Sequence, residues 1–485
     1  MYADLVPEAC LLGGAVACLL GGSFLPRTRQ WVARVVAVAA LLGSLVSAVV
    51  TAVVAGAAGP TTFDGSYALD GGTTAARVLA AAITLVVVAL GTAELAGDRR
   101  ESETYCLLLL AALGVVVLAG ASDLLVLVVG FLLASIPVYG LVGLGRTRPG
   151  TEAAVRTYLL GALAGILLML GVTLLTALAG GSTYRELAER LPGAPLAAVG
   201  VGVLLVLVGL LFEAGAVPLH PWVPDAVQGT RTAVAAFLTT VPKVGALLAL
   251  SRLVETVPAA VPVRPVVGGL AAASLVLGTF AAFGQHDLRR LLGWSTVSQV
   301  GFLLVPVAAA GRSPLAVGSL VLYLAGYAVT TLALFAVLAA LPQQRTLTDV
   351  RGSARAHPWL TAVVLLGLLG TAGTPPTAVF LGKLTTFTAA WEAGLAWLVV
   401  VAVAATVASL FYLLRWGAAV LPWSAPSGPG AAAEPADPEP ADPEPADPGP
   451  AGRWAASTAV LCAAGVLVLG VGGDVVLSGT AALVR

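Results

Sequence analysis

The chain has 485 residues, of which 59% are hydrophobic and only 10% are charged. Soluble domains carry roughly 25% charged residues, and a mean hydropathy of +0.98 implies more apolar surface than a soluble fold of this size can bury. The composition therefore excludes a soluble enzyme, a disordered chain and a nucleic-acid-binding protein. The 25 basic and 25 acidic residues balance, so the net charge implies no polyanionic partner.

Apolar segments long enough to cross a bilayer recur along the whole chain. A spanning helix needs about 20 mostly apolar residues, and we predict about fourteen such spans. The expected fold class is therefore an all-α polytopic membrane protein. The spans are expected at 8–23, 32–56, 77–97, 104–120, 122–144, 154–179, 195–217, 230–253, 263–283, 295–311, 314–341, 358–386, 392–420 and 454–477.

The arginines indicate how these spans are oriented. If the connections alternate sides, the odd connections carry sixteen arginines and the opposite side carries seven. Because basic residues are enriched in cytoplasmic loops, we expect both termini outside the membrane. Asp4 and Glu8 precede the first span while Arg27 and Arg29 follow it, an order that argues against a cleaved signal peptide. The arginine- and alanine-rich composition suggests a GC-rich bacterial genome, so the expected location is the bacterial cell membrane.

Residues 424–451 differ in composition from the spans. They are rich in Pro, Ala and Gly, and all their charges are acidic. Prolines at this density favour extended polyproline geometry over helix. We expect a solvated cytoplasmic linker before the last span, and a partner-binding role for it stays open.

Lysine is rare in this chain. Of the 25 basic residues 23 are arginine, and the two lysines, Lys243 and Lys383, both lie in apolar surroundings. Burial away from water disfavours the charged ammonium form, so such a lysine can gain and lose a proton, whereas arginine stays charged. GC-rich coding alone would also remove lysine wherever arginine serves, which leaves these two as positions where arginine would not serve.

Ionisable groups inside spans cost about 2.5–3.5 kcal/mol on insertion scales and therefore point to function. Glu213 lies near the end of the seventh span, five residues before Pro218, with His220 following. A proline inside a helix frees a backbone carbonyl about four residues earlier, so Glu213 is expected beside unsatisfied backbone. The alternative is a helix-end carboxylate paired with an arginine. Glu94 and Asp123 lie near span ends and are expected to be interfacial.

Both lysines also occur in spans that contain prolines. Pro242 directly precedes Lys243 in the middle of a span, and Pro375 and Pro376 interrupt the span that carries Lys383. Interrupted helices of this kind occur in transporters, so these residues suggest a proton relay. The alternatives are a fixed structural ion pair at Lys243 and a membrane-anchoring role for Lys383.

No sequence pattern indicates a metal or nucleotide site. No paired His, Cys or carboxylate spacing in the sequence suggests a metal, and no G-x-G-x-x-G motif suggests a nucleotide. The four cysteines, Cys10, Cys18, Cys106 and Cys462, form no C-x-x-C or iron–sulfur ligand run, and we expect them to be small buried hydrophobic residues.

Three segments resemble the antiporter-like membrane subunits of respiratory complex I. They are 218–225 (PLHPWVPD) with the run to Pro242-Lys243, 285–295 (QHDLRRLLGWS) and 373–383 (GTPPTAVFLGK). Lysine at the end of the third motif is typical of subunit N in this family, and the number of spans suits that subunit.

The resemblance implies a membrane-arm subunit of NADH–quinone oxidoreductase that moves protons through Lys243, Lys383, Glu213 and His220. NADH oxidation and quinone reduction would take place elsewhere in the complex, so this chain is expected to hold no cofactor. The implied partners are other membrane subunits, the lipid bilayer and, through the complex, the quinone pool.

The resemblance also implies two inverted five-helix repeats with broken helices in spans 7 and 12. The expected organisation is an N-terminal three-helix segment at 1–100, repeats at 104–253 and 263–420, the acidic linker at 424–451 and a C-terminal helix at 454–485.

The sequence departs from the family pattern at the first set of charges. Leu132 stands where the family usually has Glu in span 5, and Glu213 stands where it usually has Lys in span 7. Arg231 replaces a proline near the expected channel entrance. Two interpretations stay open: Glu213 carries the span 7 proton step with reversed charge, or this is a diverged second copy, partly structural, with impaired pumping.

A subunit of a multi-subunit cation/proton antiporter is the alternative function, because it uses the same fold and similar broken helices. A purely structural paralogue in the membrane arm is the third. Neighbouring genes for NADH-binding or quinone-site subunits would favour complex I, and genes for small antiporter subunits would favour the antiporter.

Overall fold

The computed structural model describes residues 3–55, 61–421, 450–473 and 477, and within them the chain is almost entirely helical. The predicted acidic linker at 424–451 lies outside the described residues except for its last two positions, where the final helix has already begun.

Eighteen α-helices, three 3-10 helices of three residues each (Ala3–Leu5, Arg27–Arg29 and Leu191–Gly193) and one short hairpin make up the regular structure of these residues. The helices are α1 (Val6–Phe24), α2 (Trp31–Ala55), α3 (Gly71–Leu95), α4 (Glu101–Gly120), α5 (Leu124–Gly143), α6 (Arg148–Ala179), α7 (Tyr184–Arg190), α8 (Leu196–Ala214), α9 (Trp222–Gly229), α10 (Thr232–Thr256), α11 (Val263–Phe283), α12 (Leu288–Ala308), α13 (Ala316–Ala340), α14 (Ser353–Ala356), α15 (Pro358–Ala372), α16 (Ala378–Glu392), α17 (Ala396–Val420) and α18 (Pro450–Val471). The antiparallel strands are β1 (Thr61–Thr62) and β2 (Tyr67–Ala68).

In the described part of the chain, 13 helices are long and apolar enough to cross a membrane. The prediction of an all-α polytopic membrane protein is therefore confirmed. The remaining predicted span, 358–386, is divided into α15 and α16, which have 15 residues each. Neither half reaches the length of about 20 residues that a span needs.

Several helices begin earlier than hydropathy predicts. The tenth span was expected from residue 295, but α12 begins at Leu288 because the Asp287 side chain accepts the backbone N–H of Arg290 at 2.9 Å and caps the helix. Likewise α6 begins at Arg148 and α3 at Gly71, each behind a capping side chain. Polar first turns therefore extend these helices beyond the apolar core of the membrane.

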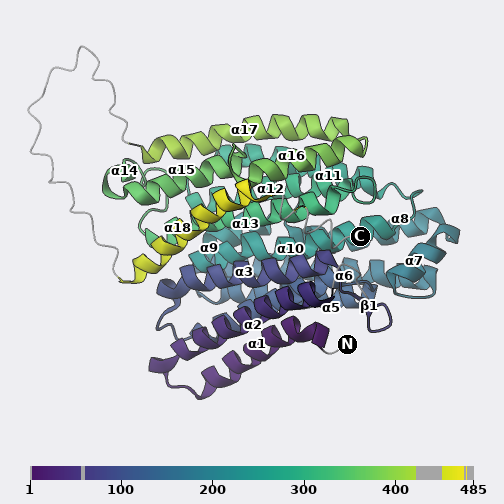
Figure 1. Ribbon diagram of the computed structural model, residues 1–485, viewed down its shortest axis with the longest axis horizontal. Helices are drawn as coiled ribbons and strands as arrows, with labels where there is room; N and C mark the ends of the chain where they lie inside the picture. The colour runs from purple at the N-terminus through teal and green to yellow at the C-terminus, as the bar shows by residue number, and fades with distance from the viewer. Residues whose placement is uncertain (1–2, 56–60, 422–449, 474–476, 478–485) are drawn as a thin grey trace, which may run out of the picture.

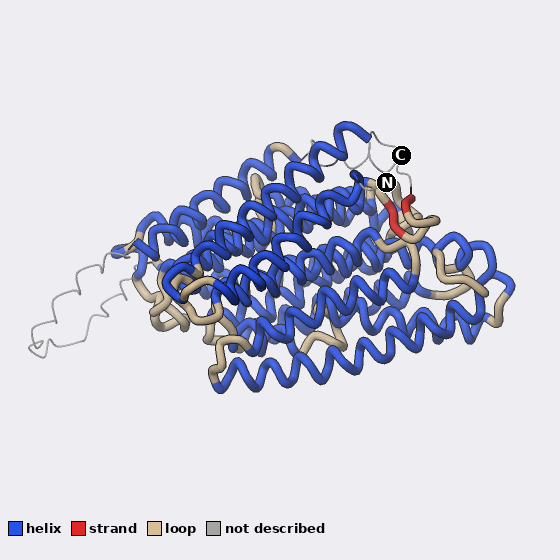
Figure 2. Tube along the Cα trace, turned by 90° about the horizontal axis from the view of Figure 1, so that it is seen from below, coloured by secondary structure: helices blue, strands red, loops and turns tan. Residues whose placement is uncertain are grey.

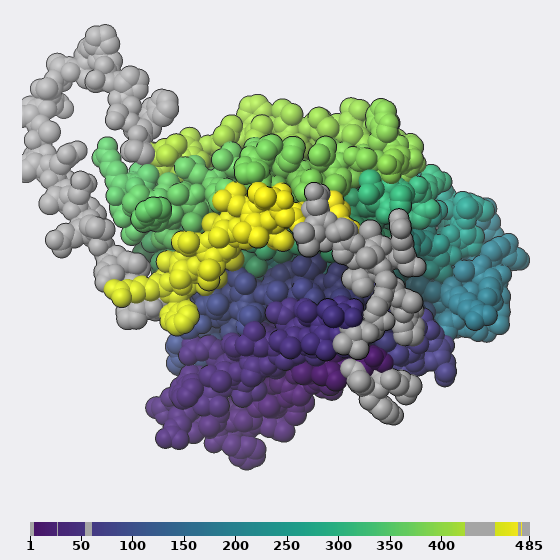
Figure 3. Space-filling view, viewed as in Figure 1, coloured from purple at the N-terminus to yellow at the C-terminus, as the bar shows by residue number. Residues whose placement is uncertain are grey.

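The long helices lie side by side, from α1 at one edge of the bundle to α17 at the other (Figure 1). The first described residues and the two short strands lie at the same end of the bundle (Figure 2). Helix α18 lies across the middle of the molecule and packs against both α3 and α13 (Figure 3). It thereby joins the N-terminal helices to the later part of the chain.

Three helices form the centre of the bundle. The apolar window of α10 is entirely buried, and those of α12 and α13 are almost entirely buried. Helix α10 packs against α3, α4, α12 and α13. Lys243 on α10 is therefore shielded from lipid on every side by other helices.

Helices α4 and α5 approach each other at backbone contact. A Cβ added to Gly114 would lie 2.2 Å from the backbone nitrogen of Ala134, and one added to Gly130 would lie 2.7 Å from the Leu118 backbone. Small residues allow such close packing between membrane helices. The contact fixes α5, and with it the side chains that α5 directs towards α8.

We expect Gly114→Ala to destabilise the fold by on the order of 1–3 kcal/mol, because the added methyl group overpacks the contact between α4 and α5. Gly200→Ala in α8 is the matched control, since a Cβ there meets no atom within 4 Å and alanine favours helix over glycine. The measurement is the thermal unfolding midpoint of the protein in native membranes. Equal destabilisation by the two changes would contradict this packing.

Candidate functional site

The helix that carries Glu213 ends inside the bundle. Helix α8 stops at Ala214, and Gly215 follows in the left-handed conformation, with φ of 76°, donating its N–H to the Leu211 carbonyl at 2.9 Å. The last carbonyls of a helix have no N–H partner in the helix itself. One of them, on Phe212, accepts the indole N–H of Trp222 at 3.1 Å. The break therefore places polar backbone deep in an apolar bundle.

Glu213 is buried, with 3% of its surface exposed, and its carboxylate accepts a 2.5 Å hydrogen bond from the Ser135 hydroxyl on α5. Among the described residues it forms no ion pair with an arginine, so the interpretation as an arginine-paired helix end is wrong. The carboxylate instead lies between α5 and the end of α8.

Lys243 is completely buried on α10, and its Nζ donates to the carbonyl oxygen of Leu238 at 2.8 Å. The Nζ also lies 5.1 Å from the centroid of the Trp222 ring. A Cβ on Gly215 would lie 3.5 Å from this nitrogen, so the ammonium is beside the end of α8. Glu213 and Lys243 interact electrostatically, but no direct ion pair joins them in the described structure.

His220 lies between the two halves of the interrupted helix, with 9% of its surface exposed. Its ring is 5.5 Å from that of Trp294 on α12, and its Nδ1 is buried without a partner among the described residues. The following helix, α9, is held by Asp225, which forms ion pairs with Arg156 at 2.6 Å and Arg290 at 2.7 Å. These ion pairs attach the segment that follows the first break, just after His220, to both α6 and α12.

A second break repeats this arrangement near Lys383. Helix α15 ends at Ala372, and Gly373 follows in the left-handed conformation, with φ of 83°. Lys383, on α16, has 4% of its surface exposed, and its Nζ donates to the Ala372 carbonyl at 2.9 Å. The Nζ lies 4.1 Å from the centroid of the Phe302 ring. A membrane-anchoring lysine would reach the surface, so the burial of Lys383 does not fit that alternative.

Two groups of buried polar side chains lie between the two lysine regions, and sequence reasoning missed them. The Tyr327 hydroxyl on α13 lies 2.8 Å from the Thr239 carbonyl, next to the carbonyl that Lys243 contacts, and 3.1 Å from the Thr296 hydroxyl on α12. The polar path from Lys243 thus continues into the second half of the bundle.

One turn further along α12, Gln299 continues this path. Its Oε1 accepts the Tyr323 hydroxyl at 2.8 Å, and its Nε2 donates to the Thr371 carbonyl at 3.1 Å. The next carbonyl, that of Ala372, holds Lys383. The run of Ser and Thr residues around Gln299, and two tyrosines four residues apart in the following span, were the sequence signals for this network.

Arg231, expected at a channel entrance, is paired with Asp98 in the connection between α3 and α4. Burial alone would raise the pKa of the Asp98 carboxyl, but the hydrogen bond from Arg231 lowers this pKa below its ordinary value. Glu94 accepts the backbone N–H groups of Thr232 and Ala233, at 2.9 and 3.0 Å, and thereby caps α10. The start of α10 is therefore fixed to the end of α3.

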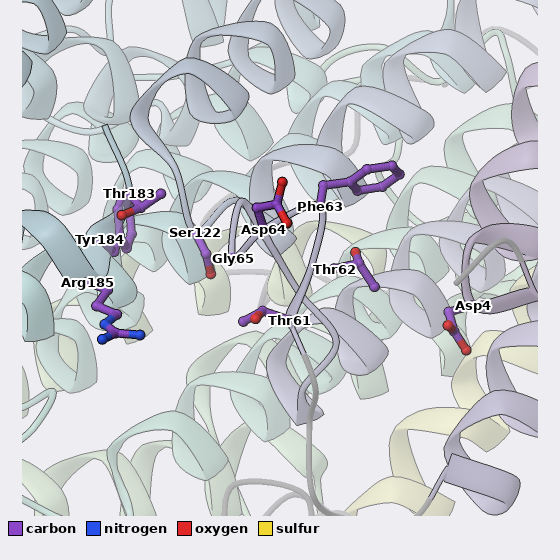
Figure 4. A pocket seen from close by; sticks show the side chains of 10 residues that line it. All are labelled: Asp4, Thr61, Thr62, Phe63, Asp64, Gly65, Ser122, Thr183, Tyr184 and Arg185. Atoms are coloured by element: carbon purple, nitrogen blue, oxygen red, sulfur yellow. The ribbon is translucent and has the colours of Figure 1, made fainter. Parts of the chain in front are cut away.

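A surface hollow of about 760 Å³ lies elsewhere, between the β1–β2 hairpin and the start of α7 (Figure 4). Asp4, Asp64 and Arg185 contribute charged side chains to it, and Thr183 in its wall caps α7 together with Glu186. None of the four predicted proton-transfer residues lines this hollow, so it is separate from the buried site.

The described residues contain no group of three His, Cys, Asp or Glu side chains able to hold a metal. The four cysteines are free. Cys18, Cys106 and Cys462 are buried, as expected for small hydrophobic residues, whereas Cys10 is only partly buried.

The family model described as "NADH:quinone oxidoreductase/Mrp antiporter, TM" matches residues 121–409 of this chain. NADH-quinone oxidoreductase subunit N of Mycobacterium sp. is 50% identical over 96% of this chain and 95% of the relative. NADH-quinone oxidoreductase subunit N 1 of Streptomyces griseus is 46% identical over 98% of this chain and 97% of the relative.

Solved structures give the same picture. A chain of respiratory complex I from Thermus thermophilus with bound aureothin superposes with a TM-score of 0.79 at 29% identity, covering 98% of this chain and 100% of that chain. A chain of the Mrp complex from Dietzia sp. has the same TM-score of 0.79 at 24% identity, covering 100% of this chain and 97% of that one. At that lower identity the second match shows the fold alone.

We expect Asp225→Asn to loosen α9, because it removes the charge that holds both Arg156 and Arg290. Hydrogen bonds to charged groups contribute about 1.5–3 kcal/mol, so amide hydrogen exchange across Trp222–Gly229 should rise at least about tenfold. Glu152→Gln is the matched control: Glu152 also pairs with Arg156, at 2.5 Å, but in the open, with its side chain 61% exposed, where such pairs contribute little. If Glu152→Gln raises amide hydrogen exchange in α9 as much, the ion pairs of Asp225 are not what holds α9 in place.

Proposed function

This chain belongs to the NADH:quinone oxidoreductase/Mrp antiporter transmembrane family, and we propose that it is the subunit N-type membrane-arm component of a bacterial NADH-quinone oxidoreductase. In this role it translocates protons through Glu213, Lys243 and Lys383, with His220 beside the first break. The translocation is coupled to NADH oxidation and quinone reduction on other parts of the complex.

The observation that carries the proposal is the placement of the only two lysines. Each is buried on a backbone carbonyl, that of Lys243 inside α10 beside the end of α8 and that of Lys383 at the end of α15, and the polar groups around Tyr327 and Gln299 lie between them. A buried lysine can exchange its proton, whereas an arginine cannot. Structural pairing alone would not require two separate ammonium groups without carboxylate partners.

The partners follow from the relatives. The matched chain at 29% identity belongs to a whole respiratory complex I, so the partners are the other membrane subunits of the complex. The quinone pool is reached through those subunits, and we assign no flavin, cluster or other cofactor to this chain. The concentration of arginines in alternate connections of the sequence supports a cytoplasmic position for those connections and an outer position for both termini.

We also propose that the bundle contains two inverted repeats, spans 4–8 (104–253) and 9–13 (263–420). Two similar breaks support this: Gly215 precedes Pro218 by three residues, and Gly373 precedes Pro376 by three. In each break the left-handed glycine lies beside a lysine Nζ. The N-terminal segment at 1–100, the linker at 424–451 and the last helix at 454–485 lie outside the repeats.

Of the two interpretations of the altered charges, the contacts favour retained proton transfer with reversed charge. Leu132 removes the usual carboxylate from α5, but Ser135, one turn later on the same helix, donates to Glu213 and keeps a polar contact between α5 and α8. Arg231 is neutralised by Asp98 rather than left as an isolated charge. A diverged copy that had lost proton transfer would not need to keep Glu213 buried and hydrogen-bonded.

We expect Lys383→Ala and Lys243→Ala each to lower the proton-to-electron ratio of the purified complex in proteoliposomes. Positioned acid–base groups typically contribute about 10²–10⁴-fold to a proton-transfer step, so transfer through this subunit should fall by at least about a hundredfold. Lys243→Arg is the control that keeps the positive charge but cannot release a proton, and it should lower the proton-to-electron ratio as well. Full pumping by Lys243→Arg would show that Lys243 does not release its proton.

Glu213→Gln tests the reversed-charge interpretation. We expect a lower proton-to-electron ratio with the complex still assembled and NADH oxidation retained, because glutamine keeps the volume and the Ser135 hydrogen bond but cannot release a proton. The control is Glu152→Gln, an exposed carboxylate remote from the bundle interior. Unchanged stoichiometry in both Glu213→Gln and Lys243→Ala would exclude pumping by the first half and leave the structural interpretation.

A further inference from the structure

We propose that Pro242 is a positioning residue for Lys243: by leaving the Leu238 carbonyl without its helical N–H partner, it reserves that oxygen for the lysine ammonium group. The proposal rests on proton transfer by Lys243, as set out above, and identifies what holds the ammonium at the break.

The first support for this role comes from the backbone hydrogen-bond pattern of α10. In an α-helix the carbonyl of residue 238 accepts the N–H of residue 242, and proline has no N–H to donate. The Leu238 carbonyl is the one that Lys243 Nζ contacts, at 2.8 Å. A lysine immediately after the proline therefore binds the acceptor that this proline leaves free.

The second support comes from the next carbonyl in the helix, that of Thr239. A proline ring inside a helix also crowds the carbonyls of the preceding turn. The Thr239 carbonyl, one residue after Leu238, accepts the Tyr327 hydroxyl at 2.8 Å. Two successive carbonyls at the proline thus bind side-chain donors, one from Lys243 and one from α13, at the start of the polar path to the second lysine.

The second lysine uses the same chemistry with a different interruption. Lys383 donates to the carbonyl of Ala372, the last residue of α15, at 2.9 Å. That carbonyl lacks a helical partner because the helix ends there. In both halves an ammonium group binds a carbonyl that lacks a backbone N–H partner in its helix. In α10 the partner is missing because residue 242 is proline, and in α15 it is missing because the helix ends.

The surroundings of Lys243 leave few other stabilising groups. In the described part of the chain, Glu213 on α8 is the charged group that acts on it, without direct contact. Helix α9 contributes the Trp222 ring, and among the described residues no charged group other than Glu213 acts on Lys243. The Leu238 carbonyl is thus the direct hydrogen-bond acceptor of the ammonium.

The test is Pro242→Ala in the assembled complex, measured as the pH dependence of proton pumping in proteoliposomes. Alanine supplies an N–H to the Leu238 carbonyl, so the ammonium form of Lys243 loses its reserved acceptor. We expect the alkaline limb of the pumping profile to move to lower pH by about one unit, the shift that corresponds to about 1.4 kcal/mol. In the Lys243→Ala background the same substitution should change nothing further.

Pro306→Ala is the matched control, because Pro306 is also a buried proline inside a helix, α12, with no lysine beside it in the sequence. It should leave the pH profile unchanged. A wild-type profile for an assembled Pro242→Ala complex would overturn the inference. If instead Lys243→Ala pumps normally, the proposed function itself fails, so the two failures are distinguishable.

Pro242→Gly offers the same N–H while allowing a bent backbone, and it carries the measurement if Pro242→Ala does not assemble. It should give the same displacement of the pH profile. Failure of both Pro242 variants to assemble, with Pro306→Ala assembling normally, would also count against the inference, because Pro242 would then be required for folding rather than for holding Lys243.

Discussion

The architecture depends on one constraint: a backbone carbonyl that a helix leaves free inside a membrane must find a donor within the protein. The breaks after α8 and α15 and the proline in α10 all create such carbonyls. At the end of α8 the Phe212 carbonyl accepts both the Gly215 N–H and the Trp222 indole N–H. The other donors are the ammonium groups of Lys243 and Lys383. Breaks and buried cations are therefore mutually dependent, since each would be costly without the other.

The sequence predicted the parts of this arrangement that carry a strong signal. Charges and prolines in apolar runs indicated both breaks and both lysines, because such residues are rare inside membranes. Ser135, Gln299 and Tyr327 were missed, since neutral polar side chains are common in apolar helices and their importance depends on which helices pack together. Helix starts were missed for a related reason: a cap such as Asp287 acts through one hydrogen bond that hydropathy does not register.

The unusual charges near the first break are explained by contacts that keep the region polar without the family's carboxylate on α5. Ser135 replaces a charge with a hydroxyl and still contacts the α8 carboxylate. Arg231 introduces a cation, and Asp98, in the connection after α3, forms an ion pair with it. Asp225 forms ion pairs with Arg156 on α6 and Arg290 on α12. The helix that follows the break is therefore attached to both halves of the bundle.

The two breaks also show why lysine occurs at these two positions, when arginine occupies every other Lys or Arg position of the chain. At both sites the ammonium nitrogen lies beside a left-handed glycine, where an added Cβ would be only 3.5 Å from it. A compact group that binds a single carbonyl fits that space, whereas a planar guanidinium with five donors would leave most of them unsatisfied in an apolar interior. Steric fit and the ability to release a proton therefore select the same side chain, and the site needs both properties if a charge is to move along a path built from backbone carbonyls and neutral hydroxyls.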